Sequence, residues 1–285
     1  MKTSRYTLLS SGSVLGLASQ SPLVRLPGYN LLRQLQEKRL ISKNMWSITL
    51  LDSETGILSI GSTIAKEMEK AKLQGELELQ RFGDPAATEE LVKQEVESKL
   101  SLPMPDNLPI DAHFKWTNIQ GAAGWWTALM SGVWVNGAKV LKNQPVLFDA
   151  QCPFILAPPT AVSRFYEAIG GVIRLPEPNN NFFAFPCLNQ VNVAFELGGW
   201  NFPSMSGEGT RADAMHGPAG GRFSLGKMGN GTGYCVGTVV ETRMGMKRDW
   251  APSGMQDMWV LGEPFFRGLG VVFDDDNGRV GFRTY

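Results

Sequence analysis

The 285-residue sequence has little of several features that mark well-known functional classes. It contains three cysteines, two histidines and no Cys-x-x-Cys pair, and the spacing of these residues fits no zinc site. No apolar run reaches the ~18 residues that a membrane-spanning helix needs. We therefore expect neither a zinc centre nor a membrane span.

The net charge is zero, because 27 basic residues balance 27 acidic ones. Domains that bind nucleic acid usually carry a basic patch or an excess of basic residues. The balanced composition gives no reason to expect nucleic acid or an anionic membrane surface as a partner.

What is present is the composition of a globular protein with many turns. Hydrophobic residues make up 43% of the chain and charged residues 19%, so a sizeable core is expected and wholesale disorder is not. The 32 glycines and 17 prolines favour an all-β protein over a helix bundle. The length fits one large all-β domain or two smaller ones.

Short apolar segments between turn residues predict the individual elements. An amphipathic helix is expected at 31–36, and a second helix at 161–169 that ends at Gly170-Gly171. Asn136-Gly137 is typical of a hairpin turn, and 207–233 is expected to form a long glycine-rich loop. Strands are predicted at 45–50, 57–61, 125–129, 132–135, 146–148, 191–197, 259–261, 270–273 and 279–282, the first two forming a hairpin.

Residues 62–112 differ in character from the rest of the chain. The segments 64–79 and 88–100 are rich in Glu, Lys, Gln and Leu, which predicts two exposed helices interrupted at Asp84-Pro85. We interpret this stretch as a charged helical insertion on the surface. An arm that binds a partner is the alternative.

Three segments, in this order, resemble landmarks of the pepsin-like aspartic peptidases (peptidase family A1). Gly16-Leu17, with the helix and hairpin that follow, resembles the end of the family's N-terminal lobe and the strands that join the lobes. Phe148–Pro153 lies where the family has its second Asp-Thr-Gly-Thr-Ser motif. The run Trp259–Arg267, followed by Val272–Asp274 and Arg279–Phe282, is similar to the family's C-terminal signature.

The resemblance implies a mainly β chain with the pepsin-like acid protease fold. We expect the tail of the N-terminal lobe and the inter-lobe strands at 1–61, the helical insertion at 62–112 and the C-terminal lobe at 113–285. The cysteine count alone allows one disulfide with one cysteine left over, or three buried thiols. By resemblance, Cys187 and Cys235 form the disulfide that the family's C-terminal lobe usually has, which leaves Cys152.

The chemistry of this family requires two carboxylates that share one proton, so that one acts as base and the other as acid on a bound water. Each lobe supplies one aspartate in an Asp-Thr-Gly sequence, and no Asp-Thr-Gly occurs here. The second motif reads Asp149-Ala150-Gln151-Cys152-Pro153, which loses three hydroxyls and places a side chain where the family has glycine. Asp149 is therefore a degenerate second-lobe catalytic candidate, and the alternative is a loop aspartate bonded to backbone or solvent.

By resemblance, the activity class is aspartic endopeptidase, a hydrolase of peptide bonds that needs no cofactor and takes a peptide or protein substrate. We expect this chain to be inactive, because the first Asp-Thr-Gly and the flap that closes over substrate are absent. Three alternatives remain open: a non-catalytic pseudopeptidase that binds peptide, a truncated gene model that lacks the N-terminal lobe, and a dimer that pairs two copies of Asp149.

Several other residues receive structural interpretations. Trp125, Trp126 and Trp134 are expected to be core or sheet-face aromatics rather than a ligand platform. Cys152 has no histidine near it in sequence, which favours a small buried residue over a nucleophile. His216, in the glycine-rich loop, is interpreted as a surface residue.

The cellular compartment is left unknown by the sequence. The family is usually secreted or vacuolar, but the longest apolar piece at the N-terminus, Tyr6–Leu9, is too short for the ~7–15 residues of a signal-peptide core. Asn230-Gly231-Thr232 matches the acceptor sequence for N-glycosylation, which matters only if the chain is secreted.

Overall fold

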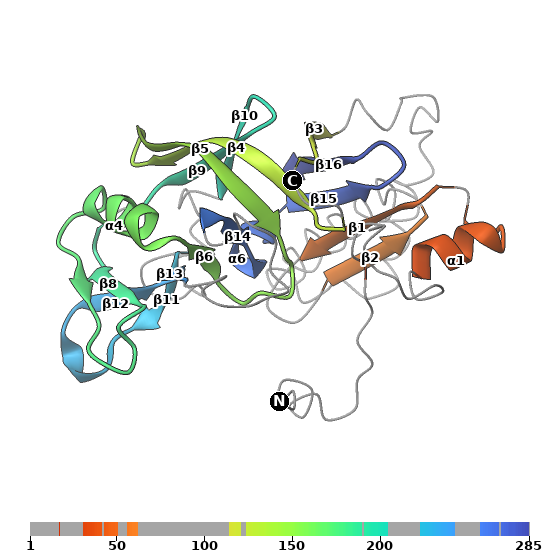
Figure 1. Ribbon diagram of the computed structural model, residues 1–285. Coiled ribbons are helices and arrows are strands. Elements are labelled where there is room, and N and C mark those ends of the chain that lie inside the picture. Colours follow the sequence, from red (N-terminus) through yellow and green to blue (C-terminus); the bar gives the residue numbers. More distant parts are fainter. Residues whose placement is uncertain are drawn as a thin grey trace, which may run out of the picture.

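The computed structural model describes residues 17, 31–41, 43–50, 56–61, 114–120, 124–189, 191–204, 223–242, 257–267 and 269–284. The predicted insertion at 62–112 lies outside these residues, as do His216 and most of the predicted glycine-rich loop. The described part of the chain is mainly β, with three sheets and short helices (Figure 1). The predicted fold class is thus confirmed.

The largest sheet contains the strands that surround Asp149. Its order is β10-β9-β4-β5-β14-β6-β13. The strands are β4 (Thr127–Val135), β5 (Ala138–Phe148), β6 (Ile155–Ala157), β9 (Val193–Leu197), β10 (Trp200–Ser204), β13 (Val239–Glu241) and β14 (Trp259–Leu261).

A long hairpin of β4 and β5 dominates this sheet in Figure 1. It turns at Asn136-Gly137, where both residues have positive φ, as the sequence predicts for a tight hairpin turn. The two short strands predicted within 125–135 instead form one nine-residue strand. A bulge between Met130 and Gly132 places one extra residue in β4, and pairing with β9 continues on both sides of it.

A second sheet joins the two ends of the described chain. Its order is β2-β1-β15-β16-β3, with β1 (Met45–Leu50), β2 (Gly56–Ile60), β3 (Lys115–Asn118), β15 (Leu269–Asp274) and β16 (Arg279–Thr284). Strand β1 pairs antiparallel with both β2 and β15, which confirms the predicted hairpin. The predicted helix is also present as α1 (Leu31–Glu37), with Leu32 buried.

The third sheet lies beside α4 (Pro159–Glu167) at one end of the molecule (Figure 1). Its order is β11-β12-β8-β7, with β7 (Ile173–Arg174), β8 (Phe183–Pro186), β11 (Ser224–Lys227) and β12 (Tyr234–Gly237). The prediction of an unbroken loop at 207–233 is wrong at β11. That strand pairs with β12 despite Gly226, because a register shift between Ser224 and Gly226 accommodates the glycine.

The predicted disulfide is confirmed in this third sheet. Cys187 and Cys235 are bonded, with their Cα atoms 5.0 Å apart. The bridge joins the residue after β8 to a buried residue of β12, and these two strands are already paired. It therefore crosslinks elements that lie far apart in the sequence.

The core is rich in aromatic side chains. Trp259, at 0% exposure, packs edge-on against Phe165 and Phe195. Around the second sheet, Trp46 stacks on Phe273 with ring centroids 4.0 Å apart, and the buried Trp126 contacts both. The prediction of a core role is confirmed for Trp126, and Trp134 lies half-buried on β4.

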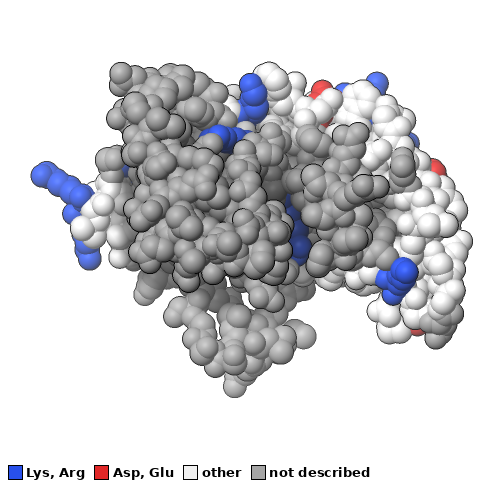
Figure 2. Space-filling view, turned by 180° about the vertical axis from the view of Figure 1, so that it is seen from behind, with Lys and Arg blue, Asp and Glu red and all other residues white. Residues whose placement is uncertain are grey.

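The described surface carries charges of both signs. Figure 2 shows single basic side chains and few acidic ones among neutral residues on its visible described surface, without a continuous patch of either sign. Within the same part of the chain, no helix is both long enough and apolar enough to cross a bilayer.

Candidate active site around Asp149

Asp149 is the first residue after a buried strand end. Strand β5 ends with Val146, Leu147 and Phe148, all of them buried, and Asp149 follows in an exposed position. Strand β14 pairs parallel with this end of β5 and antiparallel with β6. The chain therefore leaves β5 at Asp149 and re-enters the sheet as β6 on the far side of β14.

The end of β14 holds the loop that contains Asp149. The backbone N–H of Asp149 donates to the carbonyl oxygen of Leu261 at 3.1 Å, and the N–H of Glu263 donates to the carbonyl of Cys152 at 2.7 Å. Glu263 begins the short helix α6 (Glu263–Phe266), which follows β14 directly. Two backbone hydrogen bonds from opposite ends of the loop thus fix its path.

Gly262, between these two contacts, is required by close packing. A Cβ atom at this position would lie well inside 3.0 Å of the carbonyl oxygens of both Cys152 and Phe154. Such backbone oxygens have no rotamer by which to move away. Gly262 belongs to the run Trp259–Arg267 that resembles the family's C-terminal signature, whereas the family's motif has its glycine at position 151.

The carboxylate of Asp149 is hydrogen-bonded to the backbone of its own loop. Its Oδ1 accepts a hydrogen bond from the backbone N–H of Gln151 at 3.0 Å, and its carbonyl oxygen accepts one from the N–H of Cys152 at 3.1 Å. This is the way aspartates commonly stabilise turns. The alternative to a catalytic role predicted from the sequence is a loop aspartate bonded to the backbone, and these contacts are of that kind.

The replaced motif residues fit the loop without crowding it. Gln151 is exposed, so its side chain lies at the surface rather than in a tightly packed interior. Cys152 is half-buried and does not take part in the disulfide. The expectation of a small buried Cys152 is wrong, because the loop lies where β5 and β14 end, and its residues Asp149 and Gln151 are exposed.

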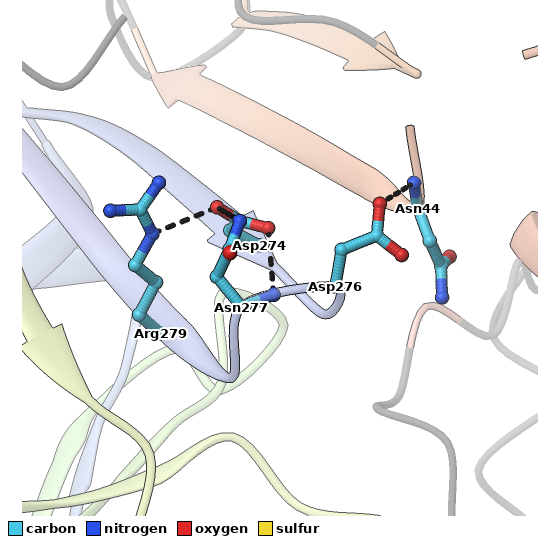
Figure 3. A network of polar contacts seen from close by, with 5 residues as sticks. All are labelled: Asn44, Asp274, Asp276, Asn277 and Arg279. Atoms are coloured by element: carbon cyan, nitrogen blue, oxygen red, sulfur yellow. Dashed lines mark hydrogen bonds and ion pairs between the residues drawn. The ribbon is translucent and has the colours of Figure 1, made fainter. Parts of the chain in front are cut away.

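A second aspartate, Asp274, has a very different environment. Its side chain is fully buried at the end of β15. Oδ2 accepts hydrogen bonds from Arg279 Nε and Asn277 Nδ2, both at 2.8 Å, and Oδ1 accepts one from the Asn277 backbone at 3.2 Å. Figure 3 shows these groups converging on one carboxylate.

The same turn is tied to the N-terminal part of the chain. Asp276 accepts a hydrogen bond from the backbone N–H of Asn44 at 2.8 Å (Figure 3), and the Asn44 side chain donates to Asp275 at 2.9 Å. Asn44 directly precedes β1. The acidic run at 274–276 therefore fixes both a tight turn and the start of the neighbouring strand, which sequence reasoning did not assign.

Some of the other acidic residues in the described part form ion pairs. Glu196 lies 2.6 Å from Lys139 Nζ and accepts a hydrogen bond from Trp134 Nε1; the hydrogen bond from Lys139, then that from Trp134, lowers the pKa of Glu196. Glu241 is buried and paired with Arg174. In the described ranges, no group of three or more His, Cys, Asp or Glu side chains is placed to hold a metal ion.

The described chain is mainly β, and Asp149 lies on the loop that follows β5, which agrees with the fold class and the motif position that the resemblance implies. Comparison with known families agrees. The model of the eukaryotic aspartyl protease family matches residues 90–285, and the chain belongs to this family.

A curated relative gives a similar result. An aspartic protease of Phaffia rhodozyma is 25% identical over 163 residues, which cover 55% of this chain and 34% of the relative. The chain thus spans about a third of the length of that relative. The predicted resemblance to the family is confirmed.

Proposed function

We propose that this chain, by itself, binds peptides without hydrolysing them. The observation that carries the proposal is the state of Asp149, an exposed carboxylate whose hydrogen bond comes from the backbone of its own loop. No Asp-Thr-Gly is present in the sequence to supply its usual partner.

The chemical argument concerns the shared proton. Two carboxylates a few ångströms apart cannot both ionise easily, and this conflict makes one of them an acid and the other a base. A single carboxylate has no second carboxylate with which to share a proton. It therefore has no means of activating water and protonating the leaving group in the same site.

The loop supports binding more readily than it supports chemistry. Its backbone is held against Leu261 and Glu263, so the path beside Asp149 is fixed without help from the lost hydroxyls. A carboxylate at an exposed position accepts hydrogen bonds from the N–H groups of an extended peptide. We propose that this half of a cleft is the surface that peptides contact.

The proposal includes the division of the chain into 1–61, 62–112 and 113–285. The pairing of β1 with β15 supports the view that the first segment contributes strands to a sheet completed by the last. Limited proteolysis tests the division. Cleavage is expected first within 62–112, with the fragments before and after the cut remaining associated.

Hydrolysis is tested with a denatured protein substrate between pH 3 and 6, with and without pepstatin. The purified chain is compared with Asp149→Ala, after circular dichroism shows that both are folded. We expect no cleavage from either. Pepstatin-sensitive cleavage that disappears in Asp149→Ala would show that Asp149 finds a second carboxylate, for example in a dimer, and would contradict the proposal.

Binding is tested separately by fluorescence anisotropy with labelled peptides from the same substrate. Asp149→Arg is expected to change the affinity at least several-fold, because it reverses the charge of the proposed contact. Glu167→Arg makes the same charge reversal at an exposed position on α4 and should leave affinity unchanged. Equal effects of the two variants would show that peptides bind elsewhere.

A further inference from the structure

The tripeptide Asn230-Gly231-Thr232 is the one Asn-x-Ser/Thr sequence in the chain, and the proposed peptide binding does not involve it. Asn230 lies within the single-turn helix η3 (Gly229–Gly231). This turn connects β11 to β12 at the tip of the four-stranded sheet. Acceptor sites for N-glycosylation lie on such surface turns.

The space around the turn is open. Gly229, Gly231 and Thr232 are all exposed. An added Cβ would meet no atom within 4 Å at Gly229, at Gly231 or at Gly233. A bulky group attached to this turn therefore has room beside the backbone on both sides of Asn230.

The disulfide supplies a second, independent observation. Cys235 lies three residues after Thr232 and is bonded to Cys187. Disulfides persist in oxidising compartments and are rare in the cytosol. The lumen in which secretory proteins form disulfides is also where asparagine receives its glycan, so one route of synthesis accounts for both features.

An exposed apolar side chain lies next to the same turn. Leu188 is 96% exposed, and the N–H of the preceding Cys187 donates to the carbonyl of Gly233 at 2.9 Å. The turn that carries Leu188 is therefore adjacent to the turn that carries the tripeptide. A hydrophilic glycan here would shield an apolar group that otherwise faces water.

We propose that Asn230 is an N-glycosylation site. The amide nitrogen Nδ2 would form a bond to the anomeric carbon of an oligosaccharide carried on a lipid pyrophosphate. The bond from that carbon to the phosphate oxygen breaks, the lipid pyrophosphate leaves, and Nδ2 loses one proton. The cell's oligosaccharide transferase and its lipid-linked donor supply the reaction.

The test is expression of the full chain behind a cleavable secretion leader in yeast. Total protein, from cells and medium together, is treated with peptide N-glycosidase and examined by mass spectrometry. Removal of the leader shows that the chain has entered the secretory lumen. We expect the enzyme to reduce the mass by one core glycan and to convert Asn230 to aspartate in its peptide.

Three variants make the test specific. Asn230→Gln and Thr232→Ala should lose the enzyme-sensitive mass completely, whereas Thr232→Ser preserves the acceptor sequence and should retain it. Because glycan attachment is measured on total protein, a variant that folds poorly still gives a result. A wild-type chain that has lost its leader but carries no enzyme-sensitive mass would overturn the proposal.

Discussion

Asp149 and Asp274 are aspartates in two segments that resemble family motifs, and they differ in exposure and in hydrogen bonding. Asp149 is exposed and accepts a hydrogen bond from its own loop. Asp274 is fully buried and receives three hydrogen bonds from Asn277 and Arg279. The motif that suggested catalysis thus contains a weakly engaged carboxylate, and the motif that suggested only a fold contains a strongly engaged one.

The difference shows which part of the family pattern this chain retains. A buried carboxylate requires compensation by charge and hydrogen bonds, so changes around Asp274 would cost stability directly. An exposed carboxylate carries no such requirement, and its neighbours can change without unfolding the protein. The backbone hydrogen bonds that hold the Asp149 loop are present. The hydroxyl residues of the family's second motif and a first Asp-Thr-Gly are not in the sequence.

The largest effect is expected from Gly262→Ala, which tests the framework itself. The added Cβ would press on the carbonyl oxygens of Cys152 and Phe154, and backbone atoms cannot move aside cheaply. We expect a loss of at least about 4 kcal/mol, the range of exceptional core substitutions. Gly229→Ala, where the added Cβ meets nothing within 4 Å, is the control and should change stability by less than about 1 kcal/mol in urea unfolding.

Asp274→Ala should be next, at about 3–5 kcal/mol, because it removes one partner of a buried charged pair. The remaining partner, Arg279, also stacks over Trp116, with its guanidinium carbon 3.9 Å from the ring centroid. A double-mutant cycle with Arg279→Met separates the pair from this stacking. A coupling energy near zero would show that Asp274 and Arg279 act independently.

Removal of the disulfide by Cys187→Ser together with Cys235→Ser should cost about 2–4 kcal/mol, mainly because the unfolded chain gains freedom over a separation of 48 residues. Thermal unfolding with and without reducing agent checks this result in the wild-type chain. If the reduced wild type and the double variant have equal melting temperatures, the effect belongs to the bond and not to the serines. An unchanged melting temperature on reduction would contradict the expectation.

The smallest effect concerns pH and Glu196. Its pKa is lowered in the folded chain by Lys139 and Trp134, so its stabilising contribution is present above the pKa of the unfolded state, about 4.3. That contribution is lost as the pH falls through the lower folded-state pKa. The half-exposed geometry limits it to about 1 kcal/mol or less.

Glu196→Gln should therefore lower stability at neutral pH and have little effect at the acid end of the range. Unfolding curves between pH 2 and 7 measure this difference. Glu167→Gln, an exposed glutamate on α4, is the control. A Glu196→Gln effect that does not depend on pH would rule out a contribution from the ion pair.

Much of the fold follows from the sequence, for local physical reasons. Asn136-Gly137 specifies a hairpin turn because both positions need positive φ, and the apolar run 259–261 is a strand buried on both sides. The strand β11 was missed, since Gly226 and the register shift beside it hide the pairing pattern. Likewise the two segments within 125–135 join into one strand through a bulge that has no clear signature in sequence.

The candidate site was predictable in position but not in its contacts. The resemblance places Asp149 after a strand, and this placement is observed. The role of Gly262 depends on carbonyl oxygens 108 and 110 residues away in the chain, and that of Asp274 on Asn277 and Arg279 adopting one turn. Contacts of this kind are set by packing between distant segments, which residue spacing alone does not report.

The most direct test of the contrast compares Asp149→Asn with Asp274→Asn in urea unfolding. Each substitution removes a charge and keeps nearly the same shape. We predict a change within about 0.5 kcal/mol for Asp149→Asn and a loss of at least about 2 kcal/mol for Asp274→Asn. Equal losses, or a larger loss for Asp149→Asn, would contradict the conclusion that Asp274 is the aspartate on which the fold depends.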